Sequence, residues 1–269
     1  MHQRVQPMIP CHPLPSSQVS GLPGGLARGL PPAWPARRLH AASVAAASDA
    51  PAGGHSPQAS DLVQWVQRAG GSVSGVAVRR WNGADGGSGF GLQAAAAVPA
   101  GAPLVTLPPA AHLTYGAATD PNLLALIARV PEELWGAKLA LQLLAKRLEG
   151  GAGSHDPYVA ALPRGFPGLP MFFPPEAVQA LEYPPVTSQI TRRCRWLLGF
   201  SADVLAPARG AAGDPFGGAL VDAGALGWAL GAVTSRAFRT RGPAHPAALL
   251  PLIDMVSPRT RKVCTKWLR

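Results

Sequence analysis

The sequence predicts an α+β protein in which short strands come first and helices follow. Short apolar runs lie at 76–78, 88–92 and 104–108, separated by Gly, Pro and Asn residues. Such runs between turn residues are typical of short strands. From residue 121 to about residue 200, apolar side chains recur at helical spacing instead. The chain therefore changes from strand-forming to helix-forming near residue 116.

The first elements surround a Gly-x-Gly segment. Ser60 is expected to cap a helix over residues 61–69, which Gly70 and Gly71 end. After the strand at 76–78, Gly89-Phe90-Gly91 follows a glycine-rich loop. A turn between strands is the first interpretation, and close approach of the backbone to a ligand is the second. A dinucleotide-binding fingerprint is excluded, because a turn at residues 98–101 replaces the helix that it requires.

The helical stretch has its own start and stop signals. Pro131 suits the first position of a helix, with acidic residues in its first turn and basic residues in its last turn. The expected apolar stripe consists of Trp135, Leu139, Leu143 and Leu148. Thr187 is expected to cap a further helix, with Arg192, Arg193 and Arg195 on its solvated face. Tyr158, Trp135 and Trp196 are interpreted as core residues.

The segment from 226 to 256 contains two charged residues that follow apolar stretches, Arg236 and Asp254. Apolar residues at helical spacing over 226–233 predict a helix that ends near Arg236. Asp254 follows the aliphatic run 249–253, which we expect to be a buried strand. A carboxylate there needs hydrogen-bond donors. Two interpretations stay open at this point: a structural ion pair between Arg236 and Asp254, or contacts from both side chains to a ligand.

Composition and charge exclude several classes of protein. The net charge of +10 lies at the ends: +3 in residues 1–50 and +5 in the last eleven, which leaves +2 for residues 51–258. A basic face for nucleic acid is therefore not expected. No apolar run is long enough to span a membrane. The three cysteines are odd in number and widely spaced, so neither a metal site nor a disulfide framework is expected.

Residues 1–52 have the composition of a targeting segment. They are rich in Arg, Ser, Pro, Ala and Gly, contain almost no acid and lack a long apolar run. This composition is typical of an organellar transit peptide rather than of a secretory signal. The alternative is a disordered low-complexity extension. We expect import into the chloroplast stroma.

Several motifs occur in the order found in one family. These are Phe90-Gly91-Leu92, then Asp156-Pro157-Tyr158, then Ser235-Arg236-Ala237-Phe238, and finally Leu252-Ile253-Asp254. In this order they resemble the SET-domain proteins of the plant Rubisco large-subunit lysine methyltransferase type. The resemblance implies a β-rich SET core split by a helical insertion. It places the N-terminal part of the core at 60–115, the insertion at 116–218 and the C-terminal SET segment at 219–256.

The resemblance also implies a cofactor and a substrate. The cofactor would be S-adenosylmethionine, and the substrate would be a lysine side chain of a protein, for example a chloroplast protein. The cofactor-binding residues carried over are Ser88, Phe90, Gly91, Arg236 and Asp254. Ser88 stands where the family carries an acidic residue. Ser235 and Phe238 would line the lysine channel.

The resemblance stops after Asp254. The family continues with an Asn-His pair and, further on, a catalytic tyrosine, whereas Val256 is followed here by a basic, non-homologous tail at 257–269. The three tyrosines, Tyr115, Tyr158 and Tyr183, all precede Arg236. We therefore assign no catalytic residue and expect a truncated family member without the helical substrate-binding domain. The alternative function is a non-catalytic protein-binding or decoy module.

Overall fold

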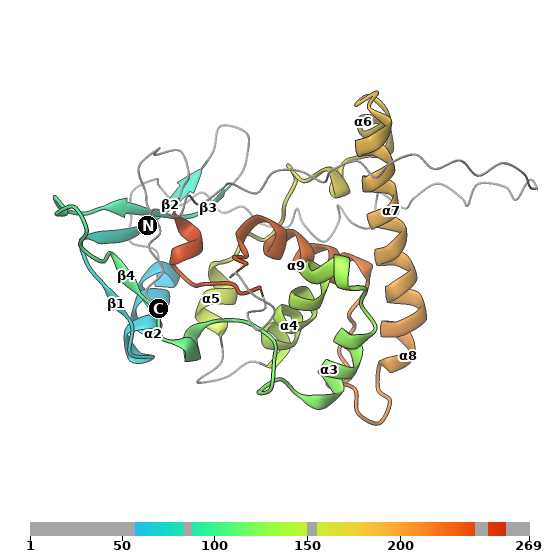
Figure 1. Ribbon diagram of the computed structural model, residues 1–269, viewed down its shortest axis with the longest axis horizontal. Coiled ribbons are helices and arrows are strands. Elements are labelled where there is room, and N and C mark those ends of the chain that lie inside the picture. The colour runs from blue at the N-terminus through green and yellow to red at the C-terminus, as the bar shows by residue number, and fades with distance from the viewer. Residues whose placement is uncertain (1–56, 83–87, 150–154, 240–246, 257–269) are drawn as a thin grey trace, which may run out of the picture. The chain divides into compact units, whose positions relative to one another are not determined.

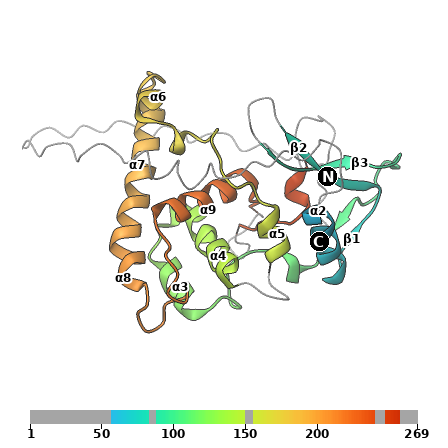
Figure 2. The same cartoon turned by 180° about the vertical axis from the view of Figure 1, so that it is seen from behind.

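Two short antiparallel strand pairs and a larger group of helices make up the described part of the chain (Figures 1 and 2). The computed structural model describes residues 57–82, 88–149, 155–239 and 247–256. These residues belong to one compact unit, residues 35–269. The expected transit peptide at 1–52 and the basic tail at 257–269 lie outside the described residues.

The strands form two separate pairs. Strand β2 (Val76–Asn82) pairs with β3 (Ser88–Ala94) in a register that runs from Val76 opposite Ala94 to Asn82 opposite Ser88. The shorter strands β1 (Ser72–Val73) and β4 (Val105–Thr106) form the second pair. The first interpretation of Gly89-Phe90-Gly91 as a turn is wrong, because all three residues pair with β2 inside β3.

The first helix, α2 (Pro57–Arg68), begins three residues before its expected cap, Ser60. Pro57 suits a first helical turn, where no backbone N–H is needed. The helix buries Leu62 and Val66 against the core. It ends at Arg68, and the turn that follows contains Gly70, whose φ of +93° only glycine adopts without strain.

The central helices are fixed at their ends by caps and prolines. The short 3-10 turn η1 (Pro109–Ala111) leads to α3 (Pro121–Ala128), where the Asp120 carboxylate accepts hydrogen bonds from the backbone N–H groups of Asn122 and Leu123. Pro131 does not start an α-helix directly. It precedes the 3-10 turn η2 (Glu132–Leu134), and α4 (Trp135–Glu149) follows.

Further helices complete the stretch between the strands and the last segment. They are α5 (Asp156–Ala161), η3 (Pro170–Phe172), α6 (Pro175–Gln179), α7 (Pro184–Phe200), the π-helical turn η4 (Ser201–Leu205) and α8 (Ala206–Ala208). The predicted cap of α7 is wrong. The helix begins at Pro184 because proline suits its first turn, and the Thr187 hydroxyl instead donates to the Pro184 carbonyl.

Helix α9 (Ala223–Arg236) packs along α4 in the middle of the core. Fully buried leucines and valines from both helices meet there, among them Leu139, Leu143, Leu226 and Val233. Gly136 lets the helices approach closely, since a Cβ at this residue would lie 3.2 Å from a Leu230 methyl. Leu148 does not belong to this stripe, because it lies in the last turn of α4 and is 44% exposed.

The expected strand at 249–253 is not formed. Ala248 pairs with Phe238 on one side and Leu249 pairs with Leu113 on the other, each as an isolated antiparallel bridge. The chain then turns at Leu252 into the 3-10 turn η5 (Ile253–Met255). Leu249, Leu250 and Leu252 of the aliphatic run are buried as predicted. Within the run only Leu249 pairs with another segment of the described chain, and a single paired residue does not make a strand.

Candidate ligand-binding site

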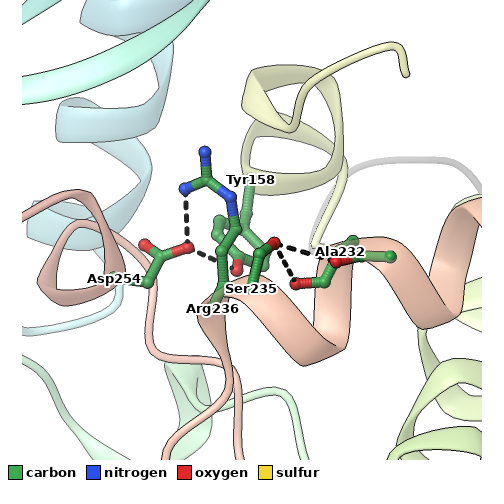
Figure 3. Close-up of polar contacts among 6 residues, drawn as sticks. Tyr158, Ala232, Ser235, Arg236 and Asp254 are labelled. Carbon is green, nitrogen blue, oxygen red and sulfur yellow. Dashed lines mark hydrogen bonds and ion pairs between the residues drawn. The ribbon is translucent and has the colours of Figure 1, made fainter. Parts of the chain in front are cut away.

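The C-terminal end of α9 and the turn η5 bring the two predicted charged residues together. The Arg236 Nη1 atom donates a hydrogen bond of 3.0 Å to Oδ2 of Asp254 (Figure 3). The Arg236 side chain is 12% exposed, whereas that of Asp254 is 0% exposed. Burial of the carboxylate is tolerated because the guanidinium compensates its charge. The two residues therefore form an ion pair, and their predicted contacts with a ligand stay a prediction.

A third side chain, that of Tyr158 on α5, completes this cluster. Its hydroxyl donates to the same Asp254 oxygen at 2.9 Å, and the residue is 0% exposed (Figure 3). The sequence interpretation of Tyr158 as a core residue is correct for its ring but missed its hydroxyl. A buried tyrosine hydroxyl usually finds a hydrogen-bond partner. That rule was the only signal in the sequence that pointed to this contact.

The electrostatics of the cluster keep the Tyr158 hydroxyl protonated, so it can donate its hydrogen bond. Burial raises the pKa of Tyr158 well above its usual value, and the neighbouring Asp254 carboxylate raises it further. Burial also raises the pKa of Asp254, and the Arg236 guanidinium opposes this rise. Within the described part of the chain, Oδ1 of Asp254 is buried without a hydrogen-bond partner. The carboxylate thus has one oxygen with two donors and one with none.

The backbone before Asp254 is strained. Leu252 is fully buried and has φ of 68° and ψ of −43°. Backbone conformations of this kind cost about 1–3 kcal/mol and occur where the surrounding structure enforces them. The turn is closed by a 3.0 Å hydrogen bond from the Asp254 N–H to the Leu250 carbonyl. This strained turn fixes where the Asp254 carboxylate lies.

Strand β3 lies against the same cluster through Gly89 and Gly91. A Cβ atom on Gly89 would lie 4.0 Å from Nη2 of Arg236, and one on Gly91 would lie 3.8 Å from the Met255 carbonyl oxygen. Both distances are ordinary contacts, and neither glycine has a positive φ. Neither local conformation nor packing therefore requires glycine at these two positions. We call this side of β3 the glycine face.

The neighbouring residues of the hairpin alternate between two sides. Because side chains alternate along a strand, Phe90 and Leu92 lie opposite the glycine face. Both are half-buried and pack against the hydrophobic core. Arg79 pairs with Gly91 in the register and so lies on the glycine face. The backbone of Ser88 opens β3, and its side chain lies outside what the structure describes.

The two residues predicted to contact a lysine substrate lie on either side of the end of α9. The Ser235 hydroxyl donates back to the carbonyls of Gly231 and Ala232, as Figure 3 shows for Ala232. Phe238 is half-buried, and its backbone pairs with Ala248. Ser235 directly precedes Arg236 and Phe238 follows it two residues later, and Arg236 donates to the Asp254 carboxylate.

The described residues contain neither a metal-binding cluster nor a membrane-spanning helix. No group of three or more His, Cys, Asp or Glu side chains that could hold a metal ion was found among them. No helix among them has the length and apolar character needed to cross a membrane.

The comparison with protein-family models and with curated proteins found no match. Among solved structures, the chain is similar to the SET domain of LSMT bound to methyllysine and AdoHcy, with a TM-score of 0.56 and 20% identity over 79% of this chain and 47% of that chain. The SET domain of LSMT bound to lysine and AdoHcy gives a TM-score of 0.56 and 19% identity over 78% and 45%. The chain therefore spans about half the length of the solved structures that it matches. The likeness confirms the predicted α+β fold as SET-like.

Proposed function

We propose that this chain is a protein-lysine N-methyltransferase of the SET-domain type, and that it binds S-adenosylmethionine beside β3 at Gly89 and Gly91, within reach of Arg236. One observation carries the proposal. Gly89 and Gly91 have no conformational or packing reason to be glycine, and Gly89 lies beside the Arg236 guanidinium. A backbone without side chains leaves room for a ligand to approach closely. The SET-like fold, whose solved relatives bind AdoHcy, supports this choice of ligand.

The guanidinium has donors left for a ligand. Among the described residues, its one hydrogen bond is from Nη1 to Asp254. Nε and Nη2 are unused there, and a guanidinium pairs well with a carboxylate through two parallel hydrogen bonds. Arg236 would bind the carboxylate of the methionine part of the cofactor. Asp254 would support Arg236 through Oδ2 and offer Oδ1 to a ligand N–H group.

The reaction itself depends mainly on positioning. The sulfonium cofactor supplies a methyl group, which a neutral lysine amine attacks as the carbon–sulfur bond breaks. The amine nitrogen gains the methyl group and loses a proton, and S-adenosylhomocysteine leaves. The residues of this chain would hold the cofactor through the glycine face and Arg236. Ser235 and Phe238, beside Arg236, are proposed to line the path of the lysine side chain.

Isothermal titration calorimetry of the 269-residue chain with S-adenosylhomocysteine tests the proposal. We expect binding of one ligand per chain. We also expect clearly weaker binding of 5′-methylthioadenosine, which lacks the carboxylate that Arg236 would hold. Equal affinity for the two ligands would contradict the role given to Arg236. No binding of either ligand would contradict the function.

A second candidate function, a non-catalytic docking module, is favoured by a surface of the helical stretch. Exposed apolar side chains lie on and just before α7 at Leu181, Tyr183, Val186 and Leu198. Arg192, Arg193 and Arg195 are exposed on the same helix. Transfer of a radiolabelled methyl group to proteins of a chloroplast extract separates the two candidates. Transfer supports the enzyme, whereas stable binding of an extract protein without transfer supports the module.

A further inference from the structure

We propose that Tyr158 is a positioning residue for the ligand site: its hydroxyl holds the Asp254 carboxylate and, through it, sets the direction of the Arg236 guanidinium. The inference rests on the proposed cofactor site. Tyr158 is not proposed to touch the ligand. It acts from α5, an element that contributes no other residue to the cluster.

The geometry shows why the ion pair needs this third member. Arg236 donates to Asp254 through one nitrogen, Nη1, to one oxygen, Oδ2. A single hydrogen bond holds the guanidinium at one point, unlike a two-bond pair, so the direction of the guanidinium depends on how firmly the carboxylate is held. The Tyr158 hydroxyl contacts the same oxygen at 2.9 Å and so fixes the carboxylate to which the guanidinium is bound.

The support is rigid because α5 is itself well held. The helix packs against α2 and α4, and the Tyr158 ring is completely buried. Three elements, α5, α9 and η5, therefore converge on one carboxylate oxygen. Burial and the Asp254 charge keep the pKa of Tyr158 well above its usual value, so the hydroxyl remains a donor across the working pH range.

The substitution Tyr158→Phe removes the hydroxyl and keeps the ring. Because the hydroxyl holds the carboxylate to which Arg236 is bound, we expect about tenfold weaker binding of S-adenosylhomocysteine. Binding of 5′-methylthioadenosine should not change, since that ligand lacks the carboxylate. A general loss of folding would weaken the binding of both ligands to the same extent. Tyr183→Phe, at a tyrosine just before α7 that is 57% exposed, is the matched control and should leave both affinities unchanged.

A double-variant cycle tests whether Tyr158 acts through Arg236. In an Arg236→Ala background, Tyr158→Phe should cost no further affinity for S-adenosylhomocysteine. An additional tenfold loss in that background would overturn the inference. Unchanged affinity of Tyr158→Phe in a protein that binds the ligand normally would also overturn it while leaving the proposed function intact. Failure of the unaltered chain to bind would instead contradict the proposed function.

A measurement without ligand keeps the inference testable in every case. In nuclear magnetic resonance spectra, a fixed guanidinium shows slow rotation about its Cζ–Nη bonds. We expect slow rotation for Arg236 in the unaltered chain and clearly faster rotation in Tyr158→Phe. Equal rotation rates in the two proteins would overturn the positioning role of Tyr158.

Discussion

Arg236 and Asp254 form an ion pair whose two members differ in exposure: the Arg236 side chain is 12% exposed and the Asp254 side chain 0%. The pair therefore has a buried end and an end that reaches the glycine face of β3. A pair that served only to stabilise the core would gain little over apolar residues of the same size. The partly exposed Arg236 side chain, with its Nη2 atom beside Gly89, is better explained by a ligand.

The first prediction concerns the stability of this pair. Arg236→Met leaves a buried carboxylate without its counter-charge, and we expect a loss of about 3–5 kcal/mol in the free energy of unfolding. Adding Asp254→Asn to that variant should recover part of the loss. Urea denaturation followed by circular dichroism measures both. Arg195→Met, on the exposed side of α7, is the control and should change stability by less than about 0.5 kcal/mol.

The second prediction concerns the glycine face. Gly91→Ala and Gly89→Ala place a methyl group at ordinary contact distance, so folding stability should hold or rise by up to about 1 kcal/mol. The same methyl groups occupy the space proposed for the cofactor. Overpacking costs about 1–3 kcal/mol, so affinity for S-adenosylhomocysteine should fall about tenfold or more.

Gly168→Ala is the control for the Gly89→Ala and Gly91→Ala variants, because a Cβ at Gly168 would meet nothing within 4 Å. Calorimetric titration of the three variants compares their affinities, and thermal unfolding compares their stabilities. If Gly91→Ala and Gly89→Ala bind the ligand as well as Gly168→Ala does, the ligand does not lie on the glycine face.

The third prediction concerns pH and His155, next to α5. Burial and the Lys146 cation lower the pKa of His155, while backbone contacts with His112 and Ala111 and the Glu149 carboxylate oppose them. Below about pH 6.5, the usual histidine pKa, the unfolded chain takes up a proton that the folded chain resists. The free energy of unfolding should therefore fall as the pH falls from about 6.5 through the folded pKa.

Urea midpoints at pH 7.5 and pH 5.5 measure that effect. His155→Gln removes the titrating group, so the difference between the two pH values should be smaller in this variant. Other groups titrate equally in both proteins and cancel in the comparison. An equal difference in the two proteins would mean that His155 is free to protonate in the folded state.

The fourth prediction concerns the packing of α9 against Phe166 and Leu169. A Cβ on Gly231 would lie 2.8 Å from the Phe166 ring and 3.2 Å from a Leu169 methyl. Gly231→Ala should therefore cost about 1–3 kcal/mol of stability through overpacking. Thermal unfolding should register the loss. Adding Phe166→Leu, which makes room, should recover part of it, and no recovery would place the strain elsewhere.

The fifth prediction concerns location. We propose that residues 1–52 direct import into the plastid, which their basic, acid-poor composition supports. A fluorescent protein that carries residues 1–54 at its N-terminus should collect in chloroplasts. A diffuse cytosolic signal would favour the alternative of a low-complexity extension.

The α+β class and most helices could be predicted from the sequence, because local signals determine them. Apolar spacing located α4, α7 and α9, and Arg236 lies at the end of α9 as expected. Element starts were less certain, since Pro57 and Pro184 begin helices before the predicted caps Ser60 and Thr187. A proline in the first turn and a polar cap are competing signals.

The site was harder to predict than the fold. Arg236 and Asp254 are conspicuous charges in apolar sequence, so their pairing could be predicted. Tyr158 lies far from both along the chain, and only tertiary structure brings its hydroxyl to Asp254. The turn at Leu252 was also unpredictable, because a leucine at φ of 68° contradicts its own local preference. The fold imposes that conformation, and an aliphatic run alone predicts a strand.

The isolated bridges of Ala248 and Leu249 bear on the order in which the protein folds. The bridge between Leu249 and Leu113 joins residues far apart in the sequence and closes a very long loop of chain, whereas the bridge between Ala248 and Phe238 closes a short one. Closing the long loop is slow compared with helix formation. The helices should therefore form first, and η5 should dock late. A ligand that needs β3, α9 and η5 together would bind only the finished protein, and it would therefore slow unfolding and raise the melting temperature with concentration.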